Sequence, residues 1–165
     1  MKQLTRQAGF TLVEAMVVMG LLAIFMTVLT SLFVRAIDVQ SKSEAYASTV
    51  SDARFIMARL DYDIARASNV TTPASLGSSS ASLVMTISGT TYTYALSSGN
   101  LQLTDAGGAD RLNSSGTTVS ALTFQRLGNS GGKESIRYSF TVTSTAHHVS
   151  GNDVRTYTST TERRL

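Results

Sequence analysis

The sequence predicts an α+β chain in which a long N-terminal helix, first transmembrane and then amphipathic, packs on a C-terminal antiparallel β-sheet. Three observations support this fold class. Residues 15–34 contain no charged side chain, apolar residues then recur at intervals of three and four, and short alternating segments follow Pro73. We therefore expect a transmembrane or assembly helix over 10–34, its amphipathic continuation over 35–72, and a β-sheet domain over 73–165.

The uncharged run is long enough to cross a membrane. About twenty helical residues at 1.5 Å each span roughly 30 Å, which is the hydrocarbon thickness of a bilayer. Glu14 stands at the head of this run. An ionisable group inside an apolar segment is costly, so a partner or a functional reason is expected for it. The alternative is an acid near the cytoplasmic interface of a simple signal anchor, where the charge costs little.

The nine residues before Phe10 form a short basic leader. They contain Lys2 and Arg6, no acid, and end in Gly9. Positive charge favours the cytoplasmic side of the membrane. A secretory signal peptide has its small residues and its cleavage point after the apolar core, whereas Gly9 precedes the core here. We therefore expect cleavage on the cytoplasmic side and retention of the apolar core.

The segment GFTLVE at residues 9–14, followed by apolar residues, resembles the processing motif of type IV pilins and type II secretion pseudopilins. The resemblance implies that residues 1–9 are a prepilin leader. It also implies that a prepilin peptidase cleaves between Gly9 and Phe10 and methylates the new amino group of Phe10. Glu14 would then neutralise the N-terminal amine of a neighbouring subunit, because two opposite charges in contact offset much of the cost of burying either one.

The resemblance also implies the pilin-like fold, a set of partners and a location. The partners are other pilin or pseudopilin subunits, an inner-membrane assembly platform and the lipid bilayer. The chain would be a single-pass protein of the inner (cytoplasmic) membrane with its C-terminal domain outside the cytoplasm. It would then enter a pilus or a periplasmic pseudopilus.

Two departures from the pattern of major pilins favour a minor subunit. The chain has no cysteine, so it lacks the C-terminal disulfide of many major pilins, and its only proline is Pro73. Without proline, the hydrophobic helix is expected to be unbroken. The acidic and arginine-rich stretch at residues 51–66 is also similar to the helix of minor pilins and J-type minor pseudopilins.

Residues 35–72 carry the spacing of an amphipathic helix with one buried stripe. The positions expected in the stripe are Tyr46, Val50, Ala53, Met57, Leu60, Ile64 and Ala67. Asp52, Asp61 and Asp63 lie between these positions together with several arginines, which predicts a salt-bridged, solvated face. This interpretation is preferred to a DNA-binding patch, for which the candidate residues are Arg54, Arg59, Arg66, Arg111 and Arg126.

The Ser/Thr-rich remainder predicts antiparallel strands, because short segments alternate polar and apolar residues. The expected strands are 82–87, 91–96, 101–104, 119–127, 136–143 and 154–161. Residues 88–90 and 97–100 are expected as hairpin turns, and the glycine-rich stretches at 107–108 and 128–132 as longer loops. One antiparallel sheet packed on the helix is the expected domain.

Composition and side-chain chemistry argue against catalysis. Loss of Lys2 and Arg6 with the leader lowers the formal charge from +3 to +1, so charge predicts no nucleic-acid partner. His147 and His148 are adjacent in an expected loop. Neighbouring side chains on an extended segment point to opposite sides, which disfavours joint metal binding with Asp153. We expect no catalytic residue, no metal site and no cofactor.

Calcium binding in the loops is an alternative that the sequence leaves open. The oxygen ligands would come from acidic and amide side chains, but no EF-hand spacing is present. Ordinary turn chemistry explains the same residues. They are Asp105, Asp110, Asn113, Asn152 and Asp153.

The sequence therefore predicts a minor pilin or minor pseudopilin, a structural subunit that initiates, caps or decorates a filament, and not an enzyme. Within the same class, a competence-type or major pilin is an alternative. Outside it, the alternatives are a signal-anchored periplasmic or extracellular binding module and, third, an anchored enzyme.

Overall fold

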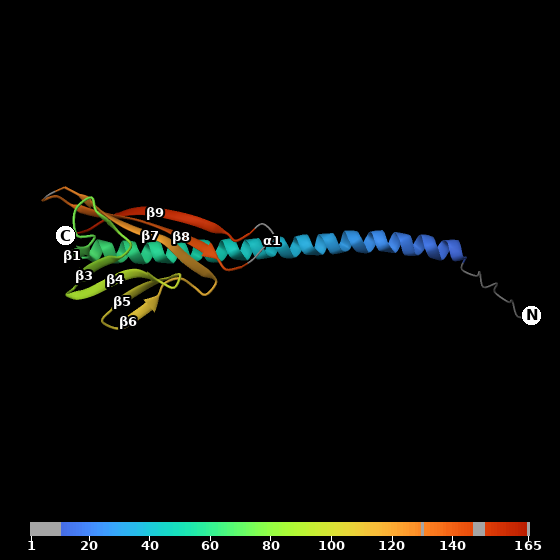
Figure 1. Cartoon of the computed structure of the whole chain (residues 1–165), viewed down its shortest axis with the longest axis horizontal. Coiled ribbons are helices and arrows are strands. Elements are labelled where there is room, and N and C mark those ends of the chain that lie inside the picture. The colour runs from blue at the N-terminus through green and yellow to red at the C-terminus, as the bar shows by residue number, and fades with distance from the viewer. Residues whose placement is uncertain (1–10, 130, 147–150, 165) are drawn as a thin grey trace, which may run out of the picture. The chain divides into compact units, whose positions relative to one another are not determined.

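The first element of the computed structural model is α1 (Leu12–Arg66), a helix that no proline interrupts. The structure describes residues 11–129, 131–146 and 151–164. Packing divides the chain into two units, Met1–Gln40 and Ser41–Leu165, and α1 contributes to both. The expected order of one long N-terminal helix followed by antiparallel β structure is confirmed (Figure 1).

The described strands form two antiparallel sheets, where a single sheet was expected. The first has the order β1-β3-β4-β5-β6 and the second the order β2-β7-β8-β9. The bounds are β1 (Asn69–Thr72), β2 (Ser79–Ser80), β3 (Leu83–Ile87), β4 (Thr90–Ser97), β5 (Asn100–Asp105), β6 (Gly108–Arg111), β7 (Thr117–Gly128), β8 (Glu134–Ser144) and β9 (Val154–Glu162). Within the second unit, β3 to β6 lie along one side of α1 and β9 along the other (Figure 1).

One apolar core joins the second part of α1 to both sheets. The helix contributes Ala53, Ile56, Leu60 and Ile64, each fully buried. From the strands come Leu83, Met85, Tyr94, Leu101, Leu103, Val119, Leu122, Phe124, Ile136, Tyr138, Phe140 and Val142. The alternating burial of β3 and β8 matches strands with one face on a core and one in solvent.

The buried stripe of α1 differs from the expected one. Tyr46 is half exposed, whereas Ile56 and Asp63 are buried, so the covered face is rotated from the predicted positions and includes a carboxylate. The reason is that two sheets, and not one, cover this part of the helix. A stripe defined by apolar residues alone could not place an acid within it.

The helix ends at Arg66, although its amphipathic part was expected to continue to residue 72. The N–H of Ser68 donates to the carbonyl of Thr86 at 2.8 Å, so the chain leaves the helix to join β3. Residues 69–72 then form β1 and pair with β3. The Asn-Val-Thr-Thr sequence of β1 suits a strand because Val and Thr are β-branched.

The expected strands all form, with ends within a few residues of the predicted ones. The short strands β1, β2 and β6 were not expected, and β6 begins in a stretch interpreted as a glycine-rich loop. Each of these has four residues or fewer, which is too short for alternation to be recognised.

Candidate functional site

The candidate site is the N-terminal segment that contains Gly9, Phe10 and Glu14. Gly9 and Phe10 lie outside the described residues, so cleavage and methylation there stay predictions. Glu14 is described and lies exposed in the first turn of α1. Its carboxylate is therefore presented on the surface of the chain, where a second molecule can reach it.

Thr11 caps this end of the helix, a feature that the sequence reasoning missed. The backbone N–H of Glu14 donates to the Thr11 hydroxyl at 3.2 Å, and the N–H of Ala15 donates to the Thr11 carbonyl at 3.1 Å. Threonine followed three residues later by glutamate is the signature of a capping box, which would have identified it. A carboxylate in the first turn also interacts favourably with the helix dipole. Glu14 thus stabilises the helix start as well as offering a charge to a partner.

Beyond Glu14, the helix presents apolar side chains that nothing in the described chain covers. Large residues such as Leu21 and Phe25 are 68 % and 57 % exposed. The helix contains a segment long and apolar enough to cross a membrane. Exposure of so much apolar surface to water is unfavourable, so we expect lipid or other apolar helices to cover it.

The hydroxyl groups in this segment do not prevent membrane insertion. Thr27, Thr30 and Ser31 each donate a hydrogen bond of 2.8 to 2.9 Å to the carbonyl four residues earlier. Satisfied in this way, they add no unpaired donor to an apolar environment. Gly20 leaves open space beside the helix, and a Cβ there would meet nothing within 4 Å. Another helix could approach closely at that point.

Residues 4–30 match the prokaryotic N-terminal methylation motif. The motif covers the predicted cleavage position, Glu14 and most of the exposed apolar segment. Together with the α+β layout, it supports a type IV pilin-like protein. A motif of this kind implies processing by a prepilin peptidase and assembly with other pilins, and with the apolar helix it indicates membrane anchoring. Comparison with curated proteins and with solved structures gives no significant match.

The second unit contains a different set of polar contacts, which join α1 to the strands. Asp52 accepts hydrogen bonds from the N–H of Ser114 at 2.9 Å, from the Ser114 hydroxyl at 2.7 Å, and from the Thr117 hydroxyl. These contacts bind the loop before β7 to the helix. The predicted solvated face is therefore wrong for Asp52, because its carboxylate faces the sheet domain.

Asp61 and Asp63 make the same kind of contact with other strands. Asp61 accepts from the Tyr138 hydroxyl at 2.7 Å and from the Thr161 hydroxyl, which places β8 and β9 beside the helix. Asp63 is 2 % exposed and accepts from the Tyr94 hydroxyl of β4 at 2.5 Å. Burial and this hydrogen bond raise the pKa of Tyr94 well above its usual range. Asp63 also forms a 2.8 Å ion pair with Arg59, four residues earlier, and this contact fits the predicted salt bridge along the helix.

The arginines considered for a DNA-binding patch are mostly used within the fold. Arg111 donates to the carbonyls of Ser114 and Thr117. Arg126 pairs with Glu134 at 2.7 Å and also donates to three carbonyls in the segment after α1. These guanidinium groups therefore have structural roles within the sheet domain.

Several of the loop residues considered for metal binding have structural partners. Asp105 accepts from the N–H of Gly107 at 2.7 Å, which closes a turn. Asn113 is buried and accepts from the N–H of Leu101 at 3.0 Å. Asp153 pairs with Arg155. His147 and His148 lie outside the described residues, and the described ones contain no group of three or more potential ligands of the His, Cys, Asp and Glu type.

Proposed function

We propose that this chain is a minor pilin or minor pseudopilin, a structural subunit that initiates, caps or decorates a type IV pilus or a type II secretion pseudopilus. The observation that carries the proposal is the methylation motif at residues 4–30, which ends within an apolar helix that the described chain leaves exposed. In this proposal the chain has no catalytic role. It is an inner-membrane protein before an assembly platform moves it into the filament.

The assembly step follows from the charge at the head of the helix. Cleavage after Gly9 would create an amino group on Phe10, and Glu14 of another subunit would pair with it. A low-dielectric helix bundle favours this contact, because neither charge is well solvated alone. Helix packing would supply the remaining contacts through the exposed apolar surface of residues 12–34.

The preference for a minor subunit rests on two features of the chain. It has no cysteine, and α1 has no proline from Leu12 to Arg66. The helix is accordingly continuous where major pilins usually carry proline. A major or competence-type pilin is the alternative within the class.

Mass spectrometry of the membrane-bound form tests the processing step. We expect loss of residues 1–9 and a methylated Phe10 when the chain is expressed with a prepilin peptidase. A Gly9→Val variant should keep its leader, while a matched Ala8→Ser variant should be processed. An intact N-terminus in the wild-type chain would contradict the proposal and favour a signal-anchored binding module.

A further inference from the structure

The outer edge of β9 is the least protected sheet edge in the described part of the second unit. The outer strands of the two sheets are β1, β6, β2 and β9, and the first three have four, four and two residues. Strand β9 has nine residues and pairs with β8 without a bulge. Edge strands are normally protected by short length, charged side chains, proline or a bulge. Strand β9, VRTYTSTTE, is long and has no proline, and its charged residues Arg155 and Glu162 lie near its two ends, so residues 156–161 carry none of these devices.

The register shows which backbone groups of β9 face outward. The N–H of Arg163, directly after β9, donates to the carbonyl of Glu134 at 2.9 Å. Residues of an antiparallel pair alternate between bonding the partner and pointing away from it. Because the pairing with β8 is continuous, the odd-numbered residues of β9 bond β8. The even-numbered residues, Thr156, Thr158 and Thr160 among them, point their N–H and C=O groups to the free edge.

The residue after β9 is consistent with this assignment. Arg164 is even-numbered, and its N–H donates away from β8 to the carbonyl of Ala65 in α1 at 3.1 Å. The helix thus reaches the outer side of the β9 edge at this one point. Among the residues that the structure describes, no other backbone group makes a hydrogen bond to the outward-facing groups of β9.

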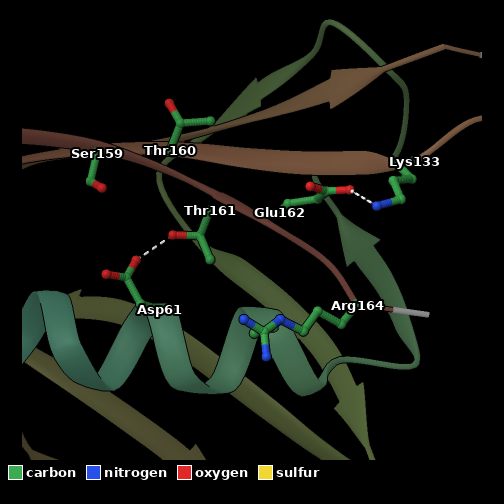
Figure 2. A pocket seen from close by; sticks show the side chains of 8 residues that line it. Asp61, Lys133, Ser159, Thr160, Thr161, Glu162 and Arg164 are labelled. Atoms are coloured by element: carbon green, nitrogen blue, oxygen red, sulfur yellow. Dashed lines mark hydrogen bonds and ion pairs between the residues drawn. The ribbon is translucent and has the colours of Figure 1, made fainter.

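A groove of about 470 Å³ lies along the same edge (Figure 2). Residues 159–162 line it from β9, Asp61 and Ala65 line it from α1, and Lys133 and Arg164 lie near the end of β9 (Figure 2). Side chains of a strand alternate between its two faces. Four consecutive lining residues therefore mean that the groove meets β9 at its backbone edge.

The position of α1 beside the groove limits what can pair with β9. A strand added to β9 would lie about 4.8 Å from it, and Asp61 and Ala65 of α1 line the same groove. The edge strand of a second copy would bring its own sheet with it, and that sheet would meet the helix. A single extended segment avoids this clash.

The charges near the groove indicate what the segment carries. Lys133 pairs with Glu162 at 2.8 Å. The guanidinium of Arg164 has no partner among the residues that the structure describes, and it extends along the groove beside α1 (Figure 2). An incoming carboxylate would satisfy it through a charge-assisted hydrogen bond.

We propose that this groove binds an extended segment of another polypeptide by strand addition to β9, with an acidic residue opposite Arg164. Backbone hydrogen bonds to the even-numbered residues supply affinity, and Arg164 supplies selectivity. The inference concerns the second unit and does not depend on processing of the N-terminus, so each can fail without the other.

Peptide titration of the full chain in detergent micelles tests the proposal. The probes are two seven-residue peptides of alternating threonine and valine, one with glutamate at both ends and one with lysine at both ends. We expect the glutamate peptide to bind at least about tenfold more tightly, as one added charge-assisted hydrogen bond would give. Amide hydrogen exchange should slow at the even-numbered residues of β9.

Two pairs of variants separate backbone and charge effects. Thr160→Pro removes an outward N–H without removing a bond to β8, and should abolish binding, while Thr160→Ala should retain it. Arg164→Gln should remove the preference for the glutamate peptide, while Arg137→Gln, on an exposed residue of β8, should not. If Thr160→Pro disturbs folding, the test rests on the wild-type chain, in which the bound glutamate peptide should slow amide hydrogen exchange at the even-numbered residues of β9.

Three outcomes would overturn the proposal. The first is that neither peptide binds the wild-type chain at millimolar concentration. The second is that Thr160→Pro folds and binds the glutamate peptide as the wild type does. Slower amide hydrogen exchange at β1 or β6, and not at β9, would count in the same way. The third is self-association that Thr160→Pro abolishes, which would assign the edge to a second copy.

Discussion

The hydroxyl of Tyr94 donates a 2.5 Å hydrogen bond to Asp63, and both side chains are buried between α1 and β4. A buried carboxylate is costly unless it is paired and hydrogen-bonded, and Asp63 has both a hydroxyl and Arg59 as partners. The contact therefore fixes the helix against the first sheet at one defined position.

Asp52 and Asp61 repeat this relationship with other parts of the sheet domain. All three carboxylates lie on one helix and accept from hydroxyl groups, and each serves a different segment. Hydroxyl-rich strands are suited to this arrangement, since Ser, Thr and Tyr can donate to a carboxylate without adding charge. The high Ser/Thr content of the chain thus has a structural use at the helix–sheet contacts.

Removal of the Tyr94 hydroxyl should destabilise the second unit. In Tyr94→Phe, Asp63 stays buried but loses one partner, and we expect unfolding to become easier by about 1 to 3 kcal/mol. Urea unfolding of the full chain in detergent measures this. Tyr62→Phe is the control, because Tyr62 is 56 % exposed and should change stability by less than about 0.5 kcal/mol. Equal effects in the two variants would contradict the anchoring role.

Stability should fall at alkaline pH. Burial, followed by the hydrogen bonds to Asp63 and Asp61, raises the pKa of Tyr94 and of Tyr138 in the folded chain. Above pH about 10 the unfolded chain loses these protons while the folded chain keeps them. Each tyrosine then lowers stability by up to about 1.4 kcal/mol per pH unit until its folded pKa is passed.

Urea unfolding between pH 8 and pH 11 checks this dependence. The stability that the two protonated tyrosines contribute is fully present below pH about 10 and is lost as the pH rises above it. In Tyr94→Phe one of the two titrating groups is absent, so the free energy of unfolding should fall less steeply with pH than in the wild type. A variant that loses stability as steeply as the wild type would show that Tyr94 ionises as readily in the folded chain as in the unfolded one.

Gly128→Ala should be among the more damaging substitutions in the β domain. Gly128 ends β7 with φ of 150°, and an added Cβ would lie 2.9 Å from the carbonyl oxygen of Lys133. Strain and clash together should cost at least about 1 to 3 kcal/mol in thermal or urea unfolding. Gly132→Ala is a matched control, since its Cβ would meet Asn129 at an ordinary 3.5 Å.

Glu14→Gln separates the two roles of this residue. Loss of a first-turn charge should weaken the helix start by only about 0.3 to 1 kcal/mol. If Glu14 pairs with a neighbouring amine, cleavage should continue but incorporation into filaments should fall at least tenfold, measured by immunoblotting of sheared filaments. Glu14→Asp keeps the charge and should retain part of the incorporation. Normal incorporation of Glu14→Gln would show that helix capping is its whole function.

Local patterns were sufficient to predict most elements of the fold. The uncharged run of residues 15–34 and the spacing from Ala53 to Ala67 predict one helix, because periodicity and length are properties of the segment itself. The same holds for the alternating residues of β3, β7 and β8. The methylation motif, matched over residues 4–30, was also recognisable, since its most distinctive part is the continuous segment GFTLVE at residues 9–14.

Pairing between distant segments could not be predicted in this way. Residues 69–72 leave the helix because Ser68 and β3 offer hydrogen bonds, and Arg126 donates to the carbonyl of Val70 from a strand much later in the chain. Division into two sheets is likewise invisible in single strands, because each alternates in the same way whichever sheet it joins.

The chain's own pattern determines that there is one apolar helix with an acid at its head, followed by hydroxyl-rich strands, since these depend only on nearby residues. Tertiary structure decides which polar groups are buried. Asp63 resembles its neighbour Asp61 in the sequence, yet it enters the core because β4 brings Tyr94 to it. Tertiary structure also leaves one long strand edge open beside α1, since an edge exists only once the order of the strands is established.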